Sequence, residues 1–343
     1  MKKFTKRISL LLLMVLAFAA TVLPVSAESK GSLYSVQAIL PENQINSKVT
    51  YYDLRMEAGQ EQIIELLVKN ISDEDVVITV SVNNAATNTN GNIMYTVAGI
   101  KDESMNHDIE SIATIRDSEF TLSVGEEKIV EIDLNMPEVT FDGVILGGIL
   151  VQGDVVNQND STDEQENGLL LENKVAYVIG LKLSETDNLV KPNMNYLGTE
   201  PVLYGLATSM GVKLQNTEAI IMKNVTVQAE IYKKNSDTLL HESTSTTVEI
   251  APNSTFNYIV DWEGQAIEAG AYRLKLKVVY EDKVWEWDEE FEVGKEETNE
   301  INDGAIEAKK PTPILLYVVL GGSIGLLLLI VAFLLGRRSK EKK

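Results

Sequence analysis

The sequence contains no cysteine, only two histidines, and few basic residues for its length of 343 residues. The absence of cysteine excludes a disulfide scaffold and thiol chemistry, so ordinary hydrophobic cores must hold the fold together. Lysine and arginine together number 30 against 51 aspartates and glutamates, and the net charge is −21. Such an acidic chain repels phosphate backbones, which excludes nucleic acid as a partner.

Catalytic and metal-binding patterns are equally scarce. His107 and His241 stand in polar surroundings far from any matching ligand pattern, so we expect solvated loop or strand-edge positions for both. Gly321 to Gly325 matches the G-x-S-x-G hydrolase pattern, but it lies in an apolar segment without the strand-to-helix turn that the motif needs. The sequence therefore predicts a protein that is not an enzyme and that uses no cofactor and no metal.

The two ends predict secretion and membrane anchoring. Residues 1–27 are typical of a signal peptide, with a basic start, a short apolar stretch and small residues at Val25-Ser26-Ala27. Residues 314–335 carry no charge and are long enough to cross a bilayer as a helix. A basic tail, 336–343, follows, which predicts a cytoplasmic C-terminus. We therefore expect a single-pass protein of the cell surface, with its N-terminal region outside the cytoplasmic membrane.

Alternation of apolar and polar residues dominates the region between these ends. Val76, Ile78 and Val80 fall on one face of an expected strand with Thr79 and Ser81 among the residues opposite, and Leu274 and Leu276 alternate with basic neighbours. Such half-buried strands belong to antiparallel sheets. The strands recur at regular intervals with turn residues between them. We predict an all-β fold of two immunoglobulin-like β-sandwich domains in tandem, followed by a charged stalk and one C-terminal transmembrane helix.

The boundary between the two sandwiches depends on an acidic segment at 155–168. It separates two apolar runs and is either a hairpin loop or a linker between domains. We favour the hairpin, because each run looks buried on both faces. The domains then cover 31–184 and 185–294, and the stalk 295–310; a linker would move the boundary to about 155–165.

Trp285 and Trp287 allow two interpretations. Exposed indoles are typical of carbohydrate binding, but both tryptophans share one strand face with Phe291, opposite a face of acidic residues. This pattern favours packing in a core.

Several phrases of the N-terminal half occur together in one known family. They are Pro41 to Ile45, Tyr51 to Leu54, Thr87 to Tyr95, and Met136-Pro137 followed by Phe141 to Ile149. With the Trp-x-Trp strand and the C-terminal apolar segment, the chain resembles the WxL-interacting proteins of Gram-positive bacteria. The resemblance implies a surface scaffold whose first domain binds peptidoglycan. Its second domain would bind WxL-domain surface proteins and host extracellular proteins.

We therefore expect a non-enzymatic adaptor that binds peptidoglycan and WxL-domain partners while anchored in the cytoplasmic membrane. The alternative is a membrane-anchored, chaperone-like assembly factor that donates or accepts an edge strand.

Asparagine and glutamine side chains in two of these phrases are our candidates for ligand binding. Amide groups both donate and accept hydrogen bonds, as recognition of peptidoglycan requires, and loops usually present such groups. The candidates are Asn43, Gln44, Asn88, Asn90 and Asn92. The alternative is structural, because asparagine beside glycine often caps a tight turn.

Overall fold

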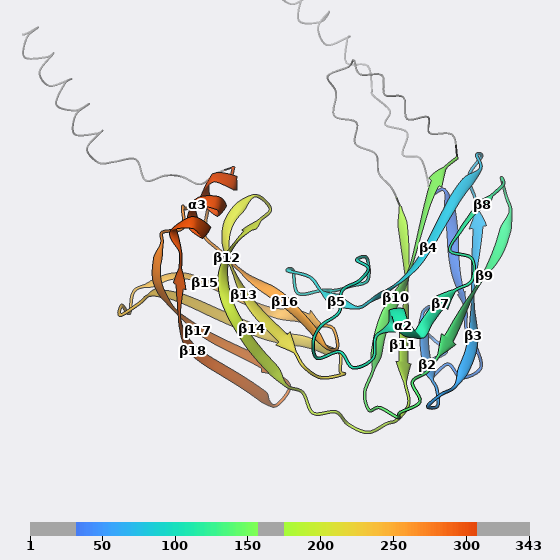
Figure 1. Ribbon diagram of the computed structural model, residues 1–343, viewed down its shortest axis with the longest axis horizontal. Helices are drawn as coiled ribbons and strands as arrows, with labels where there is room; N and C mark the ends of the chain where they lie inside the picture. Colours follow the sequence, from blue (N-terminus) through green and yellow to red (C-terminus); the bar gives the residue numbers. More distant parts are fainter. Residues whose placement is uncertain (1–31, 157–174, 307–343) are drawn as a thin grey trace, which may run out of the picture.

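The computed structural model describes residues 32–156 and 175–306 (Figure 1). The predicted signal peptide, the membrane segment 314–335 and the basic tail lie outside the described residues, as does most of the acidic segment 155–168. Within the described ranges, no helix combines the length and apolar character needed to cross a membrane. Regular structure there is almost entirely β, as the alternation predicts.

The first domain is a sandwich of two sheets with strand orders β1-β3-β9-β7 and β2-β11-β10-β4-β8. Its strands are β1 (Tyr34–Ile39), β2 (Tyr52–Arg55), β3 (Glu61–Asn70), β4 (Val76–Asn84), β7 (Ala113–Ile115), β8 (Glu119–Leu122), β9 (Glu127–Asn135), β10 (Ile145–Val155) and β11 (Ala176–Ser184). The apolar residues of each alternation point inward, so that Leu66, Ile78 and Ile132 lie in one core. The faces follow directly from the period of two.

The second domain is also a sandwich, with strand orders β12-β13-β16 and β15-β14-β17-β18. Its strands are β12 (Met194–Tyr204), β13 (Ala207–Asn216), β14 (Met222–Lys233), β15 (Leu239–Ile250), β16 (Ser254–Asp261), β17 (Gly270–Tyr280) and β18 (Lys283–Val293). Val227, Leu274 and Trp262 belong to its core.

The two apolar runs on either side of the acidic segment form β10 and β11. They pair antiparallel in one sheet of the first domain, from Ile145 opposite Leu183 to Gln152 opposite Ala176. This is the pairing that the hairpin interpretation predicts.

A short hairpin and a short helix of the first domain lie between the two sandwiches. The hairpin of β5 (Ala86–Thr87) and β6 (Ile93–Met94), together with the short helix α2 (Ile109–Ile112), connects β4 to β7. Figure 1 shows β5 between the two sandwiches. The Thr87 hydroxyl lies 2.8 Å from the Ser254 hydroxyl and accepts the Ala251 N–H at 2.9 Å. The hairpin therefore joins the domains through hydrogen bonds.

The interface between the domains also has an apolar part. Ala85 and Leu146 of the first domain form a buried cluster with Ala251 of the second. Backbone hydrogen bonding crosses the interface as well, because the Val144 N–H donates to the Ala219 carbonyl at 2.8 Å.

The predicted stalk is wrong over its first ten residues. Lys295–Gly304 form helix α3, and Figure 1 places it beside β12 of the second domain. Thr298 is buried, Ile301 packs on the second core, and the Asn302 side chain accepts the Ile267 N–H at 2.9 Å. Only a few side chains of α3 contact the second domain, so most of its residues are polar. The sequence therefore has no apolar periodicity from which the helix could be predicted.

The predictions for the aromatic residues and histidines need two corrections. Trp285 and Trp287 do face the second core, but they are only partly buried, and the fully packed tryptophan is Trp262. His241 lies on the edge strand β15, yet its side chain is only 9% exposed and its ring centroid lies 4.0 Å from that of Trp262. The predicted solvated environment of His241 is therefore wrong. His107 is half-buried, 5.6 Å from the Phe141 ring.

Candidate functional site

Two tyrosines lie over paired glycines on the outer face of the sheet β2-β11-β10-β4-β8. Gly148 of β10 and Gly180 of β11 are directly opposite each other in the ladder. A Cβ atom at Gly148 would lie 2.6 Å from the Cβ of Tyr95, and one at Gly180 would lie 3.5 Å from the Cβ of Tyr51. Because glycine has no side chain, Tyr95 approaches the sheet more closely than a Cβ at position 148 would allow, whereas Tyr51 lies at an ordinary contact distance from Gly180. We call Tyr51, Tyr95, Gly148 and Gly180 the tyrosine platform.

The two rings of the platform differ in exposure. Tyr51 is 39% exposed, whereas Tyr95 is half-buried and packs against the apolar cluster between the domains. Burial raises the pKa of the Tyr95 hydroxyl, and the nearby Glu249 carboxylate adds to the effect. The Tyr95 hydroxyl therefore stays protonated at neutral pH and can donate a hydrogen bond.

Two of the predicted amide residues hold the loop that carries Tyr51. The Gln44 side chain donates to the Tyr51 carbonyl at 2.9 Å and accepts the Asp53 N–H at 3.1 Å. The Asn43 side chain donates to the Arg55 carbonyl at 2.9 Å and exchanges hydrogen bonds with Gln62. These amides have intramolecular partners and position Tyr51.

A turn and a single amide hold the segment of Tyr95. The Asn83 side chain donates to the Tyr95 carbonyl at 2.7 Å. In the preceding hairpin, the Asn88 side chain accepts the N–H groups of Asn90 and Asn92 at 3.0 and 3.1 Å. Asn88 therefore caps the turn, as the structural alternative predicts.

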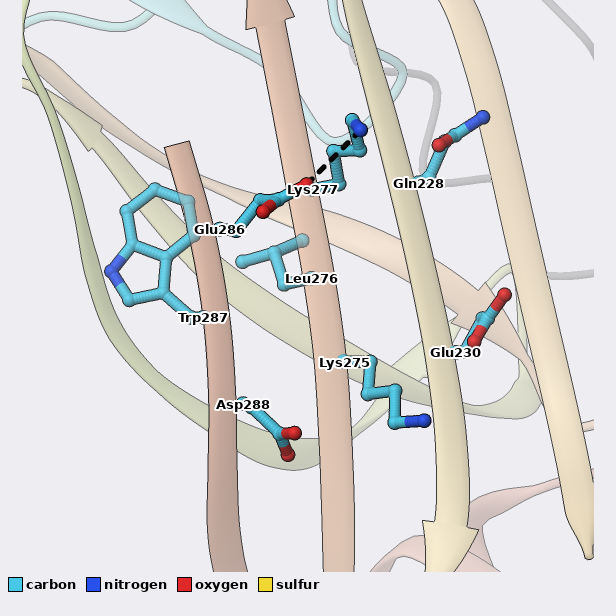
Figure 2. Close-up of a pocket in the computed structure, with 8 residues that line it drawn as sticks. All are labelled: Gln228, Glu230, Lys275, Leu276, Lys277, Glu286, Trp287 and Asp288. Atoms are coloured by element: carbon cyan, nitrogen blue, oxygen red, sulfur yellow. Dashed lines mark ion pairs between the residues drawn. The ribbon is translucent and has the colours of Figure 1, made fainter. Parts of the chain in front are cut away.

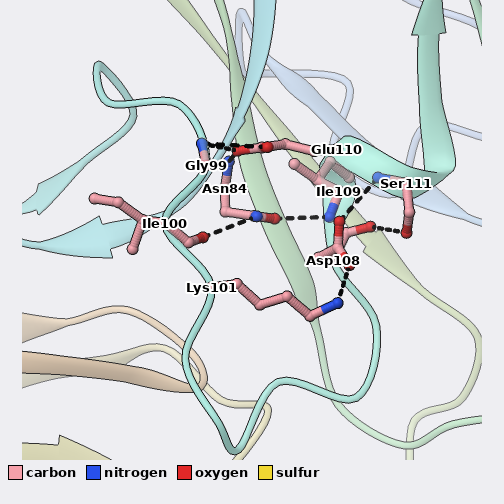
Figure 3. Close-up of polar contacts among 8 residues, drawn as sticks. All are labelled: Asn84, Gly99, Ile100, Lys101, Asp108, Ile109, Glu110 and Ser111. Atoms are coloured by element: carbon pink, nitrogen blue, oxygen red, sulfur yellow. Dashed lines mark hydrogen bonds and ion pairs between the residues drawn. The ribbon is translucent and has the colours of Figure 1, made fainter.

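A polar network fixes the loop that follows Tyr95 (Figure 3). The Asn84 side chain donates to the Ile100 carbonyl at 3.0 Å and accepts the Ile109 N–H at 2.8 Å. Lys101 pairs with Asp108 at 2.7 Å. Burial opposes ionisation of Asp108, but hydrogen bonds from Lys101 and Ser111 outweigh it and lower the pKa of this carboxyl. The loop is therefore held by charge-assisted as well as neutral hydrogen bonds.

The five amide candidates are found in two different surroundings. Asn43 and Gln44 support the Tyr51 loop, whereas the turn from Asn88 to Asn92 lies against the second domain. There the Tyr204 hydroxyl donates to the Asn90 side chain, and the Asn92 side chain is exposed. The sequence pattern did not single out the tyrosines, since alternation shows neither the glycine pairing nor which loops cross the sheet.

The outer face of β14, β17 and β18 is a second exposed surface (Figure 2). It has a hollow of about 350 Å³ in which Lys275 and Lys277 lie between acidic residues of the flanking strands. Lys277 pairs with Glu286 at 3.0 Å, and both side chains are well exposed. Figure 2 shows the Trp287 ring directed away from these charges. Exposed pairs of this kind contribute at most about 1 kcal/mol each, so we interpret this face as a solvated surface. Among the described residues, no group of three or more side chains could hold a metal ion.

The described fold defines a class: a protein of two tandem β-sandwiches. Matches to family models then identify the family within that class. The WxL Interacting Protein peptidoglycan binding domain matches residues 34–153, and the host binding domain of the same family matches residues 166–303. The chain therefore belongs to the WxL-interacting protein family, and the resemblance drawn from the sequence is confirmed.

Solved structures give weaker similarity. The PapD-like domain 7 of human CEP192 is 12% identical, with a TM-score of 0.29 over 49% of this chain and 97% of that chain. The YadV chaperone is 8% identical, with a TM-score of 0.29 over 76% and 99%. The CsuC–CsuE chaperone–tip adhesion subunit complex of Acinetobacter baumannii is 10% identical, with a TM-score of 0.31 over 66% and 89%. Similarity at this level supports no conclusion about this chain. A comparison with curated proteins found no match.

Proposed function

We propose that this protein is a non-enzymatic adaptor of the bacterial cell surface. In this proposal an immunoglobulin-like first domain, 31–184, binds peptidoglycan through the tyrosine platform. A second immunoglobulin-like domain, 185–294, binds WxL-domain surface proteins and host extracellular proteins, and residues 314–335 anchor the chain in the cytoplasmic membrane. The two matching family models support the division of labour between peptidoglycan and host binding.

The observation that carries the peptidoglycan proposal is the position of Tyr51 and Tyr95. Both lie within the residues that match the peptidoglycan binding domain, and both lie over the Gly148–Gly180 pair. A sugar ring has an apolar C–H face with polar groups at its edge. A tyrosine matches it with an apolar ring and a hydroxyl that can hydrogen-bond. The platform thus offers stacking area and hydrogen-bonding hydroxyls, which suits a ligand of sugars and amides.

The earlier hypothesis that Asn43, Gln44, Asn88, Asn90 and Asn92 bind the wall directly stays a prediction. The hydrogen bonds of Asn43, Gln44 and Asn88 favour a positioning role for these three amides. Replacing the three together by alanine is then expected to lower the melting temperature as well as wall binding. A normal melting curve with lost binding would favour direct contact instead.

Sedimentation of the full-length protein with purified cell walls tests the platform. Tyr51→Ala is expected to weaken binding about 2- to 12-fold, since an aromatic contact contributes about 0.5–1.5 kcal/mol. Tyr51→Phe keeps the ring and should retain most of the binding. Tyr232→Ala, which removes a half-buried tyrosine from the second domain, is the matched control.

One set of results would contradict wall binding by the tyrosine platform. If Tyr51→Ala and Tyr95→Phe, alone and combined, sediment like the unchanged protein and melt normally, the platform does not bind the wall. The domain would then have to bind through another surface.

The edge strands of the second domain favour a second candidate function, in which the protein accepts a strand from a partner. Its sheets end in β12, β16, β15 and β18, and three of these are 11 or 12 residues long. Long edges leave rows of main-chain groups without a neighbouring strand, which is the basis of binding by strand addition.

A further inference from the structure

A polar pocket lies at the open side of the second sandwich, where the edges of β15 and β16 meet the Asn88–Asn92 turn. Its volume is about 340 Å³. Hydroxyl groups line much of it, among them those of Tyr204, Ser209, Ser243 and Tyr258. We call it the hydroxyl pocket.

One of these hydroxyls has no partner. The side chain of Ser209 is 1% exposed, and its Oγ makes no hydrogen bond with any described residue. By contrast, the hydroxyls of Ser243 and Tyr258 lie 3.0 Å apart and satisfy each other. A buried polar group without a partner costs about 1–3 kcal/mol, and natural proteins retain few of them. Ser209 therefore indicates that the pocket binds a polar ligand.

The charged residues that line the pocket indicate the charge of its ligand. Glu242 and Asp261 are among the residues that line it, and no lysine or arginine is among them in the described part of the chain. Among the described residues, the Asp261 carboxylate accepts the N–H of Glu263 at 2.9 Å. A ligand with a positive group is favoured here, because Glu242 and Asp261 are the only charged residues among the described residues that line the pocket.

The strand beside the pocket is an edge with little protection. β15 is 12 residues long and has a neighbouring strand on one side only, β14. Its segment Ser243 to Val248 contains no charge, proline or glycine. Edges are normally blunted by such residues. The opposite edge, β18, carries five acidic residues, and β12 has Pro201 and an irregularity at Gly198.

The open edge of β15 already pairs with one outside group. The Glu249 N–H donates to the Gly91 carbonyl of the first domain at 2.8 Å. This contact covers the end of β15 nearest the first domain. The remainder of the edge runs along the hydroxyl pocket through Ser243 and Ser245. A chain continuing this pairing would pass directly by the pocket.

We infer that the open edge of β15 and the hydroxyl pocket together bind an extended segment of a partner protein. The segment adds as a strand beside Ser243 to Val248 and places one lysine or arginine side chain against Glu242 and Asp261. Pairing over this length needs several consecutive main-chain groups, which favours a polypeptide over a peptide borne on a glycan strand. The inference rests on the proposed binding of partner proteins and adds the surface and the chemistry of the partner.

A synthetic probe tests the inference on the full-length protein. The probe is an acetylated, amidated peptide of alternating threonine and valine with one central lysine, and its affinity is measured by isothermal titration calorimetry. Replacing the lysine by norleucine, or methylating alternate backbone nitrogens, is expected to weaken binding about tenfold or more. The first change removes the charge-assisted hydrogen bonds and the second removes main-chain pairing.

Matched variants locate the site. Glu242→Gln combined with Asp261→Asn should weaken the lysine peptide about tenfold, since a hydrogen bond to a charged group contributes about 1.5–3 kcal/mol. Glu286→Gln combined with Asp288→Asn makes the same charge change at the β18 edge and should leave affinity unchanged. Ser209→Ala should weaken the peptide without lowering the melting temperature, since the hydroxyl it removes has no partner in the free protein.

Three outcomes would overturn the inference: no binding of the lysine peptide at millimolar concentration, equal affinity for the N-methylated peptide, or equal losses in the two double variants. Competition by soluble peptidoglycan fragments for the pocket would also overturn it and assign the pocket to the wall. These failures differ from failure of the proposed function, because sedimentation of Glu242→Gln/Asp261→Asn with cell walls should be unchanged.

Discussion

The two sandwiches differ most at the edges of their sheets. In the first domain the edge strands β1, β7, β2 and β8 have six, three, four and four residues. In the second, β12, β16, β15 and β18 have 11, 8, 12 and 11. Short edges prevent pairing with other chains, whereas long ones invite it. One architecture therefore leaves long sheet edges in the second domain and only short ones in the first.

The interiors differ as well. The first core brings side chains close to glycines of β10: Gly147 lies against Ile109, and Gly153 lies against Tyr34. The second core fills its space with aromatic rings, since Trp262 lies between His241 and Tyr272 at centroid distances of 4.0 and 6.0 Å. Enlarging a glycine should therefore harm the first domain, and truncating an aromatic side chain should harm the second.

The largest effect is expected from Trp262→Ala. Trp262 is 4% exposed, and truncating a large buried aromatic costs about 3–5 kcal/mol in the free energy of unfolding. Trp285→Ala and Trp287→Ala should each cost less, because these side chains are only partly buried. Urea unfolding followed by circular dichroism measures all three. Equal losses would show that the β18 tryptophans belong fully to the core.

A smaller effect is expected from Gly147→Ala in the first domain. The new Cβ would lie 2.3 Å from the Ile109 side chain and 2.6 Å from the Asn83 carbonyl oxygen, which must both shift. Overpacking of this kind costs about 1–3 kcal/mol. Gly180→Ala is the matched control, because its Cβ would make an ordinary contact at 3.5 Å with Tyr51. If both variants melt alike, the close approach at Gly147 does not constrain the fold.

The contact between the domains should weaken in Asp102→Ala. The Asp102 carboxylate accepts hydrogen bonds from Gln215 at 2.8 Å and Thr255 at 2.5 Å, both in the second domain. Losing them should cost roughly 1–3 kcal/mol of interdomain stability. The two domains should then unfold in separate calorimetric transitions, whereas Asp133→Ala, which breaks an exposed pair with Arg116, should not separate them. A single unchanged transition in Asp102→Ala would contradict this.

The same carboxyl predicts an acid limit for the interface. Burial opposes ionisation of Asp102, but hydrogen bonds from Thr255, Ser104 and Gln215 outweigh it and lower its pKa. A carboxyl with a lowered folded pKa stabilises the folded state above its unfolded pKa of about 3.9, and this stability is lost as pH falls through the folded pKa.

The smallest effect is expected from His241 in the second domain. Burial lowers the pKa of its imidazole, although the Glu263 and Asp261 carboxylates oppose this. The unfolded chain then binds more protons than the folded one just below pH 6.5, so stability should fall as pH drops below about 6.5. Thermal melts between about pH 5 and 7 measure this slope, and His241→Phe should remove it. A slope that persists in His241→Phe would assign it to other groups.

Part of this fold could be read from the residues alone. The alternations at Val76 to Val80 and at Leu274 to Val278 predicted strands whose apolar faces are buried in the two cores. Alternation succeeds there because the period of a strand and the burial of one face are both local properties of the chain. It failed at Trp262 and at α3: Trp262 stands between two acidic residues at the end of β16, and α3 is polar on nearly every position.

The candidate site was predictable only in part. The phrases that carry the family resemblance contain Tyr51, Tyr95 and Gly148, but pattern reasoning selected the amides beside them. Most of those amides bind backbone groups of the chain itself, which no composition or spacing could reveal. In the structure, Asn43 and Gln44 hold the loop of Tyr51, and Asn88 caps the turn that precedes Tyr95.

The sequence by itself determined the family, the two-sandwich class and which face of most strands is buried. These properties depend on the order of residues along the chain and on the period of the apolar positions. Only the tertiary structure decided that Gly148 meets Gly180 beneath two tyrosines, and that the β15 edge runs along an unsatisfied serine. These features arise from the register between strands and the contact between domains. Register and docking depend on residues far apart in the chain, and no local pattern encodes them.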